Sequence, residues 1–457
     1  MKTLLLTCFC YMITFPFIHA QEVPWQGKSV DFSHGKLTIS QNGRFLSHID
    51  GTPFFYLGDT AWELLHLLNE TDVEKYLENR RTKGFTVIQT VILSEFDGLT
   101  IPNHNNQLPL LKNNPDKPNE AYFKWIDKII QIAEEKGLFI GLLPTWGDKV
   151  DKQWGKGPVI FNKTNAFKYG QFLGNRYKNY PNIIWINGGD RNGGNNIEVW
   201  DALAEGIKSK DPNHLMTFHP LGEESSSTWF HNRNWLDFNS FQSGHAQRSY
   251  DIYNYLVVRD YNKQPIKPCI DMEPRYEDHP VCWLPETYGW FDDVDVRQSL
   301  YWSLFSGTCG YTYGCHPVWQ FKTDQRTPLG FARHNWQEAI NFTGAGDVIH
   351  ARRLLESYDY YSRVPDQSII LWEQKFATNI AVATRGNGYA FVYLPNGYDM
   401  EVSLERIPGA KQLMLKWFNP RTGEITPIKT IPAKGKYWAK SPKAGRGNDW
   451  ILIMEAI

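Results

Sequence analysis

The chain has 457 residues, of which 42% are hydrophobic and 21% charged, a composition typical of a folded protein and not of a disordered one. Its 48 Lys+Arg nearly balance its 49 Asp+Glu, and the net charge of −1 gives no electrostatic reason to expect nucleic acid or an anionic membrane as partner. Aromatic residues make up 15% of the chain. Because aromatic rings both stack on sugars and fill cores, composition alone leaves both interpretations open.

The amino terminus predicts export. Lys2 precedes the apolar run Leu4–Ile18, and the small residue Ala20 stands before the polar Gln21, which is the pattern of a secretory signal peptide. We therefore expect residues 1–20 to be removed and the mature protein to be periplasmic or extracellular. The apolar run is short for a membrane span and no later segment approaches 18 consecutive apolar residues, so we expect no membrane span.

Four cysteines follow the signal peptide, and all lie within one short part of the chain. An oxidising compartment permits one or two disulfides among them. Their spacing fits neither CxxC pairs nor a zinc pattern, so buried thiols or a local disulfide are favoured over a metal site, and we expect no cofactor. They are Cys269, Cys282, Cys309 and Cys315.

The first structural element along the mature chain is a predicted hairpin. Alternating apolar residues flank the Gln41–Gly43 turn within residues 36–51, and we assign residues 21–52 to an amino-terminal segment that contains this hairpin.

Residues 53–364 repeat one pattern, a short apolar run followed by a loop and a helix-period stretch, which is typical of βα units. Thr71 followed by Glu74 predicts a capping box at the start of the first helix. Eight strands with intervening helices predict an α/β fold, a (β/α)₈ TIM barrel. The expected strands are 54–57, 86–91, 138–143, 183–187, 215–219, 238–242, 266–272 and 309–313, and the expected helices are 71–83, 120–136, 165–179, 196–209, 250–262 and 293–306.

Residues 365–457 show a different pattern, with alternating strands separated by glycine-containing turns and no helix signal. Turns are expected at 386–388, 395–397, 419–423 and 432–435. This part of the chain predicts a small all-β sandwich domain.

Polar residues at the carboxyl ends of barrel strands build the active site of this fold. The strand ends here supply carboxylates, amides, imidazoles and indoles, without a lysine nucleophile, a metal triad, a Gly-x-Ser-x-Gly elbow or a phosphate loop. This inventory favours cleavage of glycosidic bonds in a carbohydrate. The expected substrate-binding residues are Asp59, Trp62, Gln89, Glu95, Trp146, Asn187, His219, Gln242, His245 and His316.

Asp190 and Glu273 are the predicted catalytic pair, because each follows a strand on a different side of the barrel and two carboxyl groups can flank one bond. Two glycines before Asp190 allow a sharp turn, although the same residues suit a turn or helix-cap aspartate. Glu273 has the alternative interpretation of a salt bridge with Arg275. Asp271 is a weaker candidate nucleophile, since alternation places it on the same side as Glu273 but one step deeper.

Four sequence blocks resemble a known family. Residues 56–64, 83–89, 185–190 and 271–274 are similar to barrel glycosidases of the apiosidase-like type, glycoside hydrolase family 140, whose carboxy-terminal domain is labelled collagen-binding. The resemblance covers nearly the whole mature chain. It implies a retaining mechanism with Asp190 as acid/base and Glu273 as nucleophile, and a terminal apiose on a pectin side chain as substrate.

Two alternatives stay open at this point. A non-catalytic carbohydrate-binding or adhesive surface protein would need the aromatic residues but not two facing carboxylates, and an endo-glucanase-like barrel glycosidase would need an open groove. The loop 97–119, rich in Asn and Pro, is expected to close one end of the cleft, which favours exo action.

Overall fold

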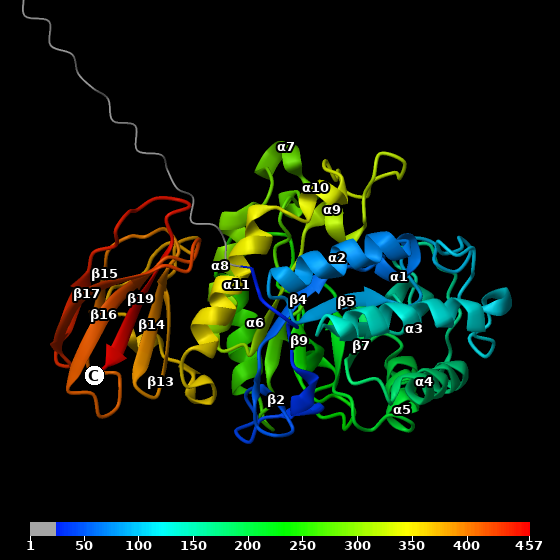
Figure 1. The fold of residues 1–457 in the computed structure, drawn as a ribbon, viewed down its shortest axis with the longest axis horizontal. Coiled ribbons are helices and arrows are strands. Elements are labelled where there is room, and N and C mark those ends of the chain that lie inside the picture. The colour runs from blue at the N-terminus through cyan, green and yellow to red at the C-terminus, as the bar shows by residue number, and fades with distance from the viewer. Residues whose placement is uncertain (1–23) are drawn as a thin grey trace, which may run out of the picture.

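A computed structural model describes residues 24–457 and shows a barrel followed by an antiparallel β domain (Figure 1). The predicted signal peptide, residues 1–20, lies outside the described residues. Strands β1 (Leu37–Ile39) and β2 (Leu46–His48) form the predicted hairpin, and β3 (Pro53–Phe54) adds a third strand before the barrel begins.

Eight parallel strands form the barrel and confirm the predicted fold class. In the order β8-β7-β6-β5-β4-β11-β10-β9, each strand is hydrogen-bonded to the next. All eight fall on the runs that the sequence predicts. They are β4 (Tyr56–Thr60), β5 (Val87–Val91), β6 (Phe139–Leu143), β7 (Ile183–Arg191), β8 (Met216–Pro220), β9 (Asn239–Phe241), β10 (Cys269–Asp271) and β11 (Gly310–Tyr313).

The last gap in the barrel, between β8 and β9, is closed mainly by side chains. Thr217 Oγ1 donates to the carbonyl oxygen of Phe238 at 2.7 Å, and Ser240 Oγ donates to that of Phe218. The backbone N–H of Asp237, just before β9, donates to the Met216 carbonyl at 2.9 Å. Hydroxyl groups therefore take the place of a regular ladder where the barrel closes.

Helices surround the barrel, and all six predicted helices form (Figure 1). The predicted capping box is wrong, because Asn69 precedes the helix and its Oδ1 accepts from the Asp72 N–H at 2.9 Å, which places Thr71 inside α2. The α-helices are α1 (Leu64–Leu67), α2 (Glu70–Thr82), α3 (Glu120–Glu135), α4 (Lys163–Tyr177), α5 (Ile197–Lys208), α6 (Asp251–Asn262), α7 (Pro285–Tyr288), α8 (Asp293–Ser306), α9 (His316–Trp319), α10 (Trp336–Ala339) and α11 (Thr343–Glu356).

Much of the aromatic content belongs to the core. Trp185, Trp200, Trp302 and Trp336 are among the largest fully buried side chains. Apolar residues of α3 recur at helical spacing and are buried against the barrel, which is why this segment forms a helix with one covered face.

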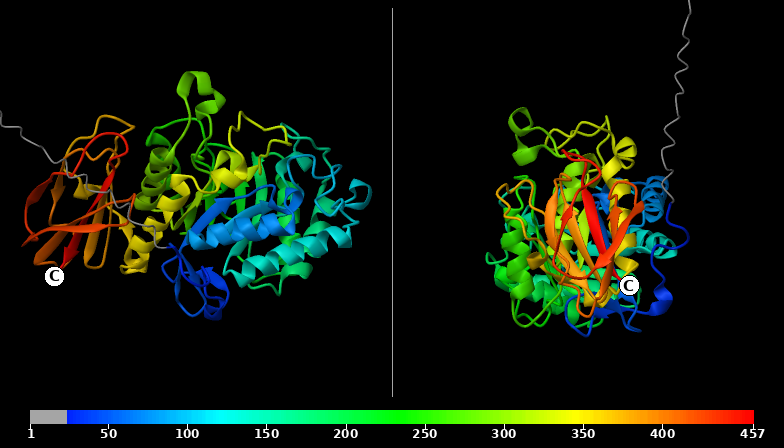
Figure 2. Two further views of the ribbon diagram at one scale, coloured as in Figure 1. Left: turned by 45° about the horizontal axis from the view of Figure 1, so that its top comes forward. Right: turned by 90° about the vertical axis from the view of Figure 1, so that its left-hand side faces the viewer.

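The carboxy-terminal domain lies beside α8 and α11 of the barrel (Figure 1, Figure 2). It has a six-stranded antiparallel sheet in the order β12-β13-β14-β19-β16-β17 and a two-stranded sheet of β15 and β18. The predicted turns fall between successive strands of the chain. Its strands are β12 (Val364–Pro365), β13 (Val382–Gly386), β14 (Tyr389–Leu394), β15 (Met400–Ser403), β16 (Gln412–Phe418), β17 (Ile425–Pro432), β18 (Lys436–Ala439) and β19 (Trp450–Ala456).

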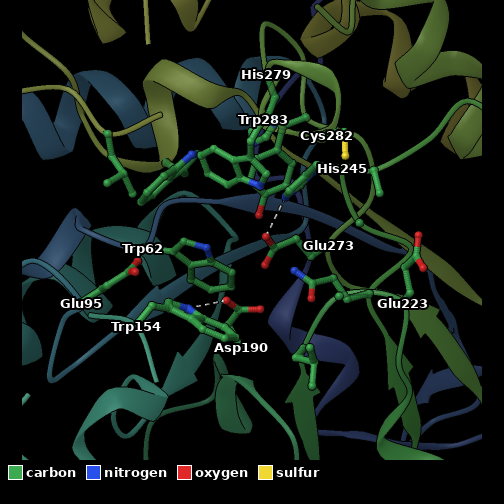
Figure 3. A pocket seen from close by; sticks show the side chains of 18 of the residues that line it. Trp62, Glu95, Trp154, Asp190, Glu223, His245, Glu273, His279, Cys282 and Trp283 are labelled. Carbon is green, nitrogen blue, oxygen red and sulfur yellow. Dashed lines mark hydrogen bonds and ion pairs between the residues drawn. The ribbon is translucent and has the colours of Figure 1, made fainter. Parts of the chain in front are cut away.

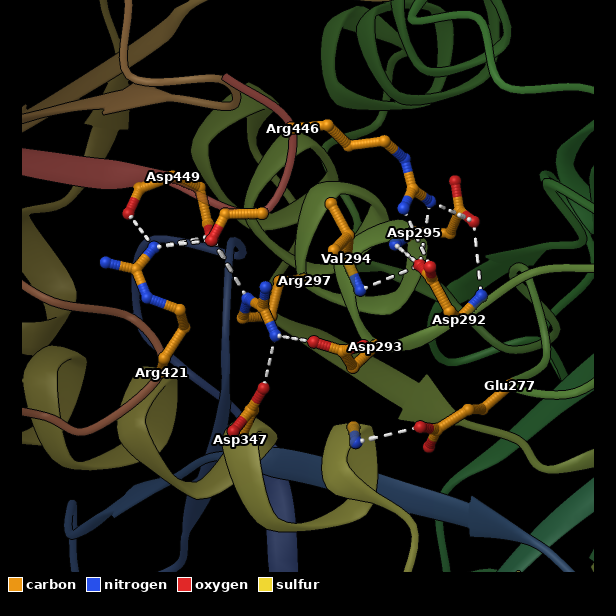
Figure 4. A network of polar contacts seen from close by, with 12 residues as sticks. Glu277, Asp292, Asp293, Val294, Asp295, Arg297, Asp347, Arg421, Arg446 and Asp449 are labelled. Atoms are coloured by element: carbon orange, nitrogen blue, oxygen red, sulfur yellow. Dashed lines mark hydrogen bonds and ion pairs between the residues drawn. The ribbon is translucent and has the colours of Figure 1, made fainter. Parts of the chain in front are cut away.

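Ion pairs join the two domains, one group of them buried and the other partly exposed (Figure 4). Arg297 of α8 places Nε 3.1 Å from Asp449 Oδ2 in the carboxy-terminal domain, and its Nη1 contacts Asp347 of α11. Arg446, from the loop before β19, donates to both carboxylate oxygens of Asp292, at 2.7 and 2.8 Å. Salt bridges therefore fix the second domain to the barrel at two points.

The four cysteines within residues 24–457 are all free thiols. Cys282 is exposed, whereas Cys269, Cys309 and Cys315 are buried. Over residues 24–457, no helix combines the length and the apolar character needed to cross a bilayer.

Candidate active site

A cleft of about 400 Å³ lies at the carboxyl ends of the barrel strands (Figure 3). Both predicted catalytic carboxylates line it, although they are far apart in the sequence. Five of the predicted binding residues line it as well: Trp62, Glu95, Trp146, Gln242 and His245.

Two glycines bring Asp190 to the cleft from the end of β7. Gly188 and Gly189 have φ of +93° and +118°, and the pairing of β7 with β8 is irregular between Gly188 and Arg191. A Cβ on Gly189 would lie 2.8 Å from the backbone nitrogen of Gly147, so only glycine fits there. Asp190 itself has φ of +56°, a left-handed conformation that is uncommon outside glycine and that is often found at functional sites.

The Asp190 carboxyl group is set up to hold a proton. Burial, followed by the negative charge of Glu273, raises its pKa to about 6. Trp154 Nε1 donates to Asp190 Oδ2 at 2.9 Å and acts in the opposite direction, because that hydrogen bond favours the ionised form.

The Glu273 carboxyl group is set up to stay ionised. His245 Nε2 donates to Oε1 at 3.0 Å, and His219 Nε2 lies 3.0 Å from Oε2. Burial alone would raise the pKa, but the interactions with the two histidines prevail and lower it to about 2. Arg275 forms no salt bridge with Glu273 and instead donates to backbone carbonyls, including that of Gln247 at 3.0 Å.

His219 connects the two carboxylate-bearing segments. Its Nδ1 accepts from the Asp190 backbone N–H at 3.3 Å, so the ring proton belongs on Nε2, the nitrogen that lies 3.0 Å from Glu273 Oε2. Trp62 and Trp146 pack against the His219 ring with centroid distances of 5.2 and 6.1 Å. The imidazole is thereby held in one orientation.

Other cleft groups are free to contact a ligand. Trp146 Nε1 and Gln242 Oε1 are buried and have no hydrogen-bond partner in the protein. A third carboxyl, that of Glu95, has a pKa well above its usual value because of burial and then the charge of Asp190. Unpaired donors and acceptors beside indole faces match the hydroxyl groups and apolar faces of a sugar.

Two predicted binding residues, Asp59 and Gln89, do not line the cleft. Asp59 faces the helices, where its Oδ2 lies 2.6 Å from Arg80 Nε and accepts from the Tyr76 hydroxyl. Gln89 faces the barrel interior and donates from Nε2 to Thr312 Oγ1 at 2.6 Å. Both predictions are corrected, because the alternation of side chains along β4 and β5 directs these residues elsewhere.

Asn187 and His316 also lie outside the cleft. Asn187 donates from Nδ2 to the Trp200 carbonyl of α5 at 2.9 Å, because the alternation of side chains along β7 directs it toward the helices. His316 is buried behind the cleft wall, with Nε2 hydrogen-bonded to the Gly330 carbonyl at 2.8 Å. These binding predictions are corrected too.

Asp271 does not share the side of Glu273. Its Oδ2 accepts from Ser243 Oγ at 2.8 Å, and the residue is fully buried away from the cleft. Strand β10 ends at Asp271, so the alternation assumed from the sequence does not extend to Glu273.

The cleft also contains aromatic residues that the sequence analysis missed. Trp154 and Trp283 stand at the mouth with 40% and 45% of their surface exposed, and Tyr276, His279 and Trp319 lie in the wall. They come from loops or from a short helix beyond the strand ends, so no strand pattern indicates them. No residue of the loop 97–119 lines the cleft, and the expectation that this loop closes it is corrected.

The sequence profile of a family described as "Apiosidase-like, catalytic domain" matches residues 40–362. The chain belongs to the apiosidase-like family. A second profile, "Putative collagen-binding domain of a collagenase", matches residues 364–455 of this apiosidase-like chain. No curated protein sequence matches it significantly.

Two solved structures are similar over almost the entire apiosidase-like chain. One, titled "Glycoside hydrolase", is 35% identical with a TM-score of 0.87 and covers 94% of this chain and 98% of its own. The other, a glycoside hydrolase family 5 protein from Bacteroides vulgatus ATCC 8482, is 34% identical with a TM-score of 0.87. The match covers 93% of this chain and 95% of that protein. This apiosidase-like protein is therefore a glycosidase, and the family resemblance in the sequence is confirmed.

Proposed function

We propose that this protein is an exported, retaining glycosidase that removes a terminal sugar, such as apiose, from a pectic side chain of the plant cell wall. The observation that carries the proposal is the contrast between two carboxyl groups in one cleft. Asp190 has its pKa raised to about 6 and Glu273 has its pKa lowered to about 2. One group holds a proton while the other is a carboxylate, as acid-assisted glycoside cleavage requires.

In the first step, a Glu273 oxygen attacks the anomeric carbon while Asp190 gives its proton to the leaving oxygen. The bond to the aglycone breaks and a glycosyl ester with Glu273 forms. In the second step, Asp190, now ionised, takes a proton from a water molecule that attacks the same carbon. The sugar leaves with its original anomeric configuration, and both carboxyl groups return to their starting states.

His219 and His245 prepare Glu273 for this role. Their Nε2 atoms each lie 3.0 Å from a different carboxylate oxygen, so the anion is stabilised without a formal ion pair to Lys or Arg. A carboxylate whose two oxygens each lie beside one imidazole nitrogen keeps lone pairs for attack and leaves readily from the ester. Trp154 similarly stabilises the ionised Asp190 that forms after proton transfer.

The dimensions and walls of the cleft support exo action. Its volume of about 400 Å³ is near the lower end for ligand pockets, and Trp154 and Trp283 stand at its mouth. A site of this size accommodates a chain end better than the middle of a polymer. The family description supports apiose as the sugar, and the amino-terminal signal pattern supports export.

Hydrolysis of an oligosaccharide with terminal apiose, followed by proton NMR from the first seconds of reaction, tests the proposal. We expect free apiose as the first product, with the substrate's anomeric configuration. The inverted anomer would refute retention, and early release of internal fragments from a polysaccharide would refute exo action. Release of another terminal sugar with apiose left in place would reassign the substrate.

A further inference from the structure

Exposed aromatic side chains gather at two places on this molecule. Over residues 24–457, nine Trp, Tyr and Phe side chains are strongly exposed. Four belong to the cleft mouth and its neighbouring loops, and one, Tyr255, stands alone on α6. The other four belong to the carboxy-terminal domain: Trp372, Phe376, Tyr398 and Trp438, with exposed fractions of 56%, 71%, 53% and 44%.

The second group is organised by the two-stranded sheet. Trp438 of β18 is paired with Glu401 of β15, and the alternate residue Ala439 is fully buried, so Trp438 projects from the outer face. The backbone N–H of Leu371 donates to the Glu401 carbonyl at 2.9 Å and fixes the neighbouring Trp372 at this edge. The two indoles meet edge to face, with centroids 5.4 Å apart and planes at 79°.

A groove of about 650 Å³ continues from Trp372 past Phe376 and Tyr398, and we name it the aromatic groove. The segment 372–379, which lines most of the groove, is hydrogen-bonded to both domains. The Tyr250 N–H of the barrel donates to the Ala377 carbonyl at 2.9 Å, and Asn396 Nδ2 donates to Asn379 Oδ1 at 2.9 Å. The aromatic rings are thus exposed on a segment whose backbone is held in place.

We propose that the aromatic groove is a second carbohydrate site, which binds a neutral segment of the polysaccharide that the cleft trims. The Trp372 indole lines the groove and offers a face for a sugar ring, the exposed Trp438 indole adjoins it at the end of the groove, and Asn396 and Asp399 add hydrogen-bonding groups. The charged lining residues are Glu373, Lys375 and Asp399, a mixture with no positive excess, which disfavours a polyanionic ligand.

Aromatic grooves also bind proline-rich polypeptides, so the choice between the two ligands depends on the rest of the molecule. The cleft of this glycosidase combines exposed indoles with carboxylate and amide groups, and the aromatic groove repeats that combination on the second domain. Two sites of the same chemistry on one chain fit one polymer that contacts both, which raises the effective concentration of chain ends at the cleft.

Affinity electrophoresis of the full chain tests the proposal. Glu273→Gln protein, which cannot degrade the gel matrix, is run through native gels that contain arabinan, galactan or xyloglucan, with polygalacturonate and gelatin as further arms. We expect retardation by at least one neutral polysaccharide. Trp372→Ala and Trp438→Ala, each in this background, should weaken the apparent affinity about fivefold to tenfold.

Tyr255→Ala is the matched control, because its exposed fraction of 56% equals that of Trp372 and it lies outside both groups. It should migrate like the parent. Trp438→Phe retains a ring and should recover much of the lost affinity, which separates loss of stacking from misfolding. Retardation that is absent, or that is unchanged in both alanine variants, would overturn the proposal, and so would tryptophan-dependent retardation by gelatin or polygalacturonate alone.

Discussion

Buried carboxyl groups at the domain boundary and in the cleft differ in their partners. At the domain boundary, Asp449 and Asp347 contact the guanidinium of Arg297. In the cleft, Asp190 and Glu273 form no ion pair with Lys or Arg among the described residues, and indole and imidazole N–H groups contact them instead. A buried carboxyl group without a Lys or Arg partner is costly to ionise, so a site that holds two of them facing one cleft has a use for their reactivity. Between these two settings it is the partner of the carboxyl group, more than its burial, that differs.

Glu273→Gln gives the largest expected effect. The substitution keeps the shape of the side chain but removes the nucleophile, and kcat should fall on the order of 10⁴-fold. Initial rates on the apiose-terminated oligosaccharide measure it, with thermal unfolding as the check that the fold persists. Activity within tenfold of the parent would remove Glu273 from the mechanism.

Asp190→Asn removes the proton donor and should lower kcat by about 10²- to 10⁴-fold. The loss should be smaller for a substrate whose leaving group needs no proton, such as a dinitrophenyl glycoside. Asn tolerates the left-handed backbone at this position, so the cleft geometry is retained. Equal losses on both substrates would contradict an acid role for Asp190.

Arg297→Met tests the structural setting. It leaves Asp347, which is buried, without its guanidinium partner, and it removes one of the two arginines that contact Asp449, so the free energy of unfolding should fall by about 3–5 kcal/mol. Urea denaturation measures the loss. The double variant with Asp347→Asn should recover part of it, and kcat per folded molecule should stay near the parent value. A loss of activity without a loss of stability would contradict the division between the two settings.

The pH dependence gives the smallest effect. Asp190 must be protonated to act as acid, so kcat/KM should decline as pH rises through its pKa of about 6. Trp154→Phe removes a hydrogen bond that favours the ionised form, and the pKa should therefore rise and move this decline to higher pH. Measurement of kcat/KM from pH 4 to 9 in both proteins tests the direction, and a shift to lower pH would contradict it.

Sequence reasoning placed the strands well and the side chains less well, for a physical reason. Apolar runs locate a strand, but side chains alternate every residue, so an error of one position reverses the face of each. Asn187 shows this, since its side chain contacts Trp200 of α5 and not the cleft. Asp190 reaches the cleft from the last residues of β7 and Glu273 from just after β10, whereas Trp154 and Trp283 come from segments beyond the strand ends, whose course the alternation does not encode.

The contacts of Arg446 determine what can be removed from this protein. Its guanidinium shares Asp295 with Arg248, and Arg248 donates to the carbonyls of Tyr288 and Trp290, in the loop that follows Trp283. A chain cut after residue 362 would lose Arg446 and Asp449 together, and with them a contact to Asp295 beneath this loop and one of the three carboxylate partners of Arg297. The carboxy-terminal domain is therefore not an interchangeable module. A fusion of this barrel to a different second domain would have to supply equivalents of Arg446 and Asp449.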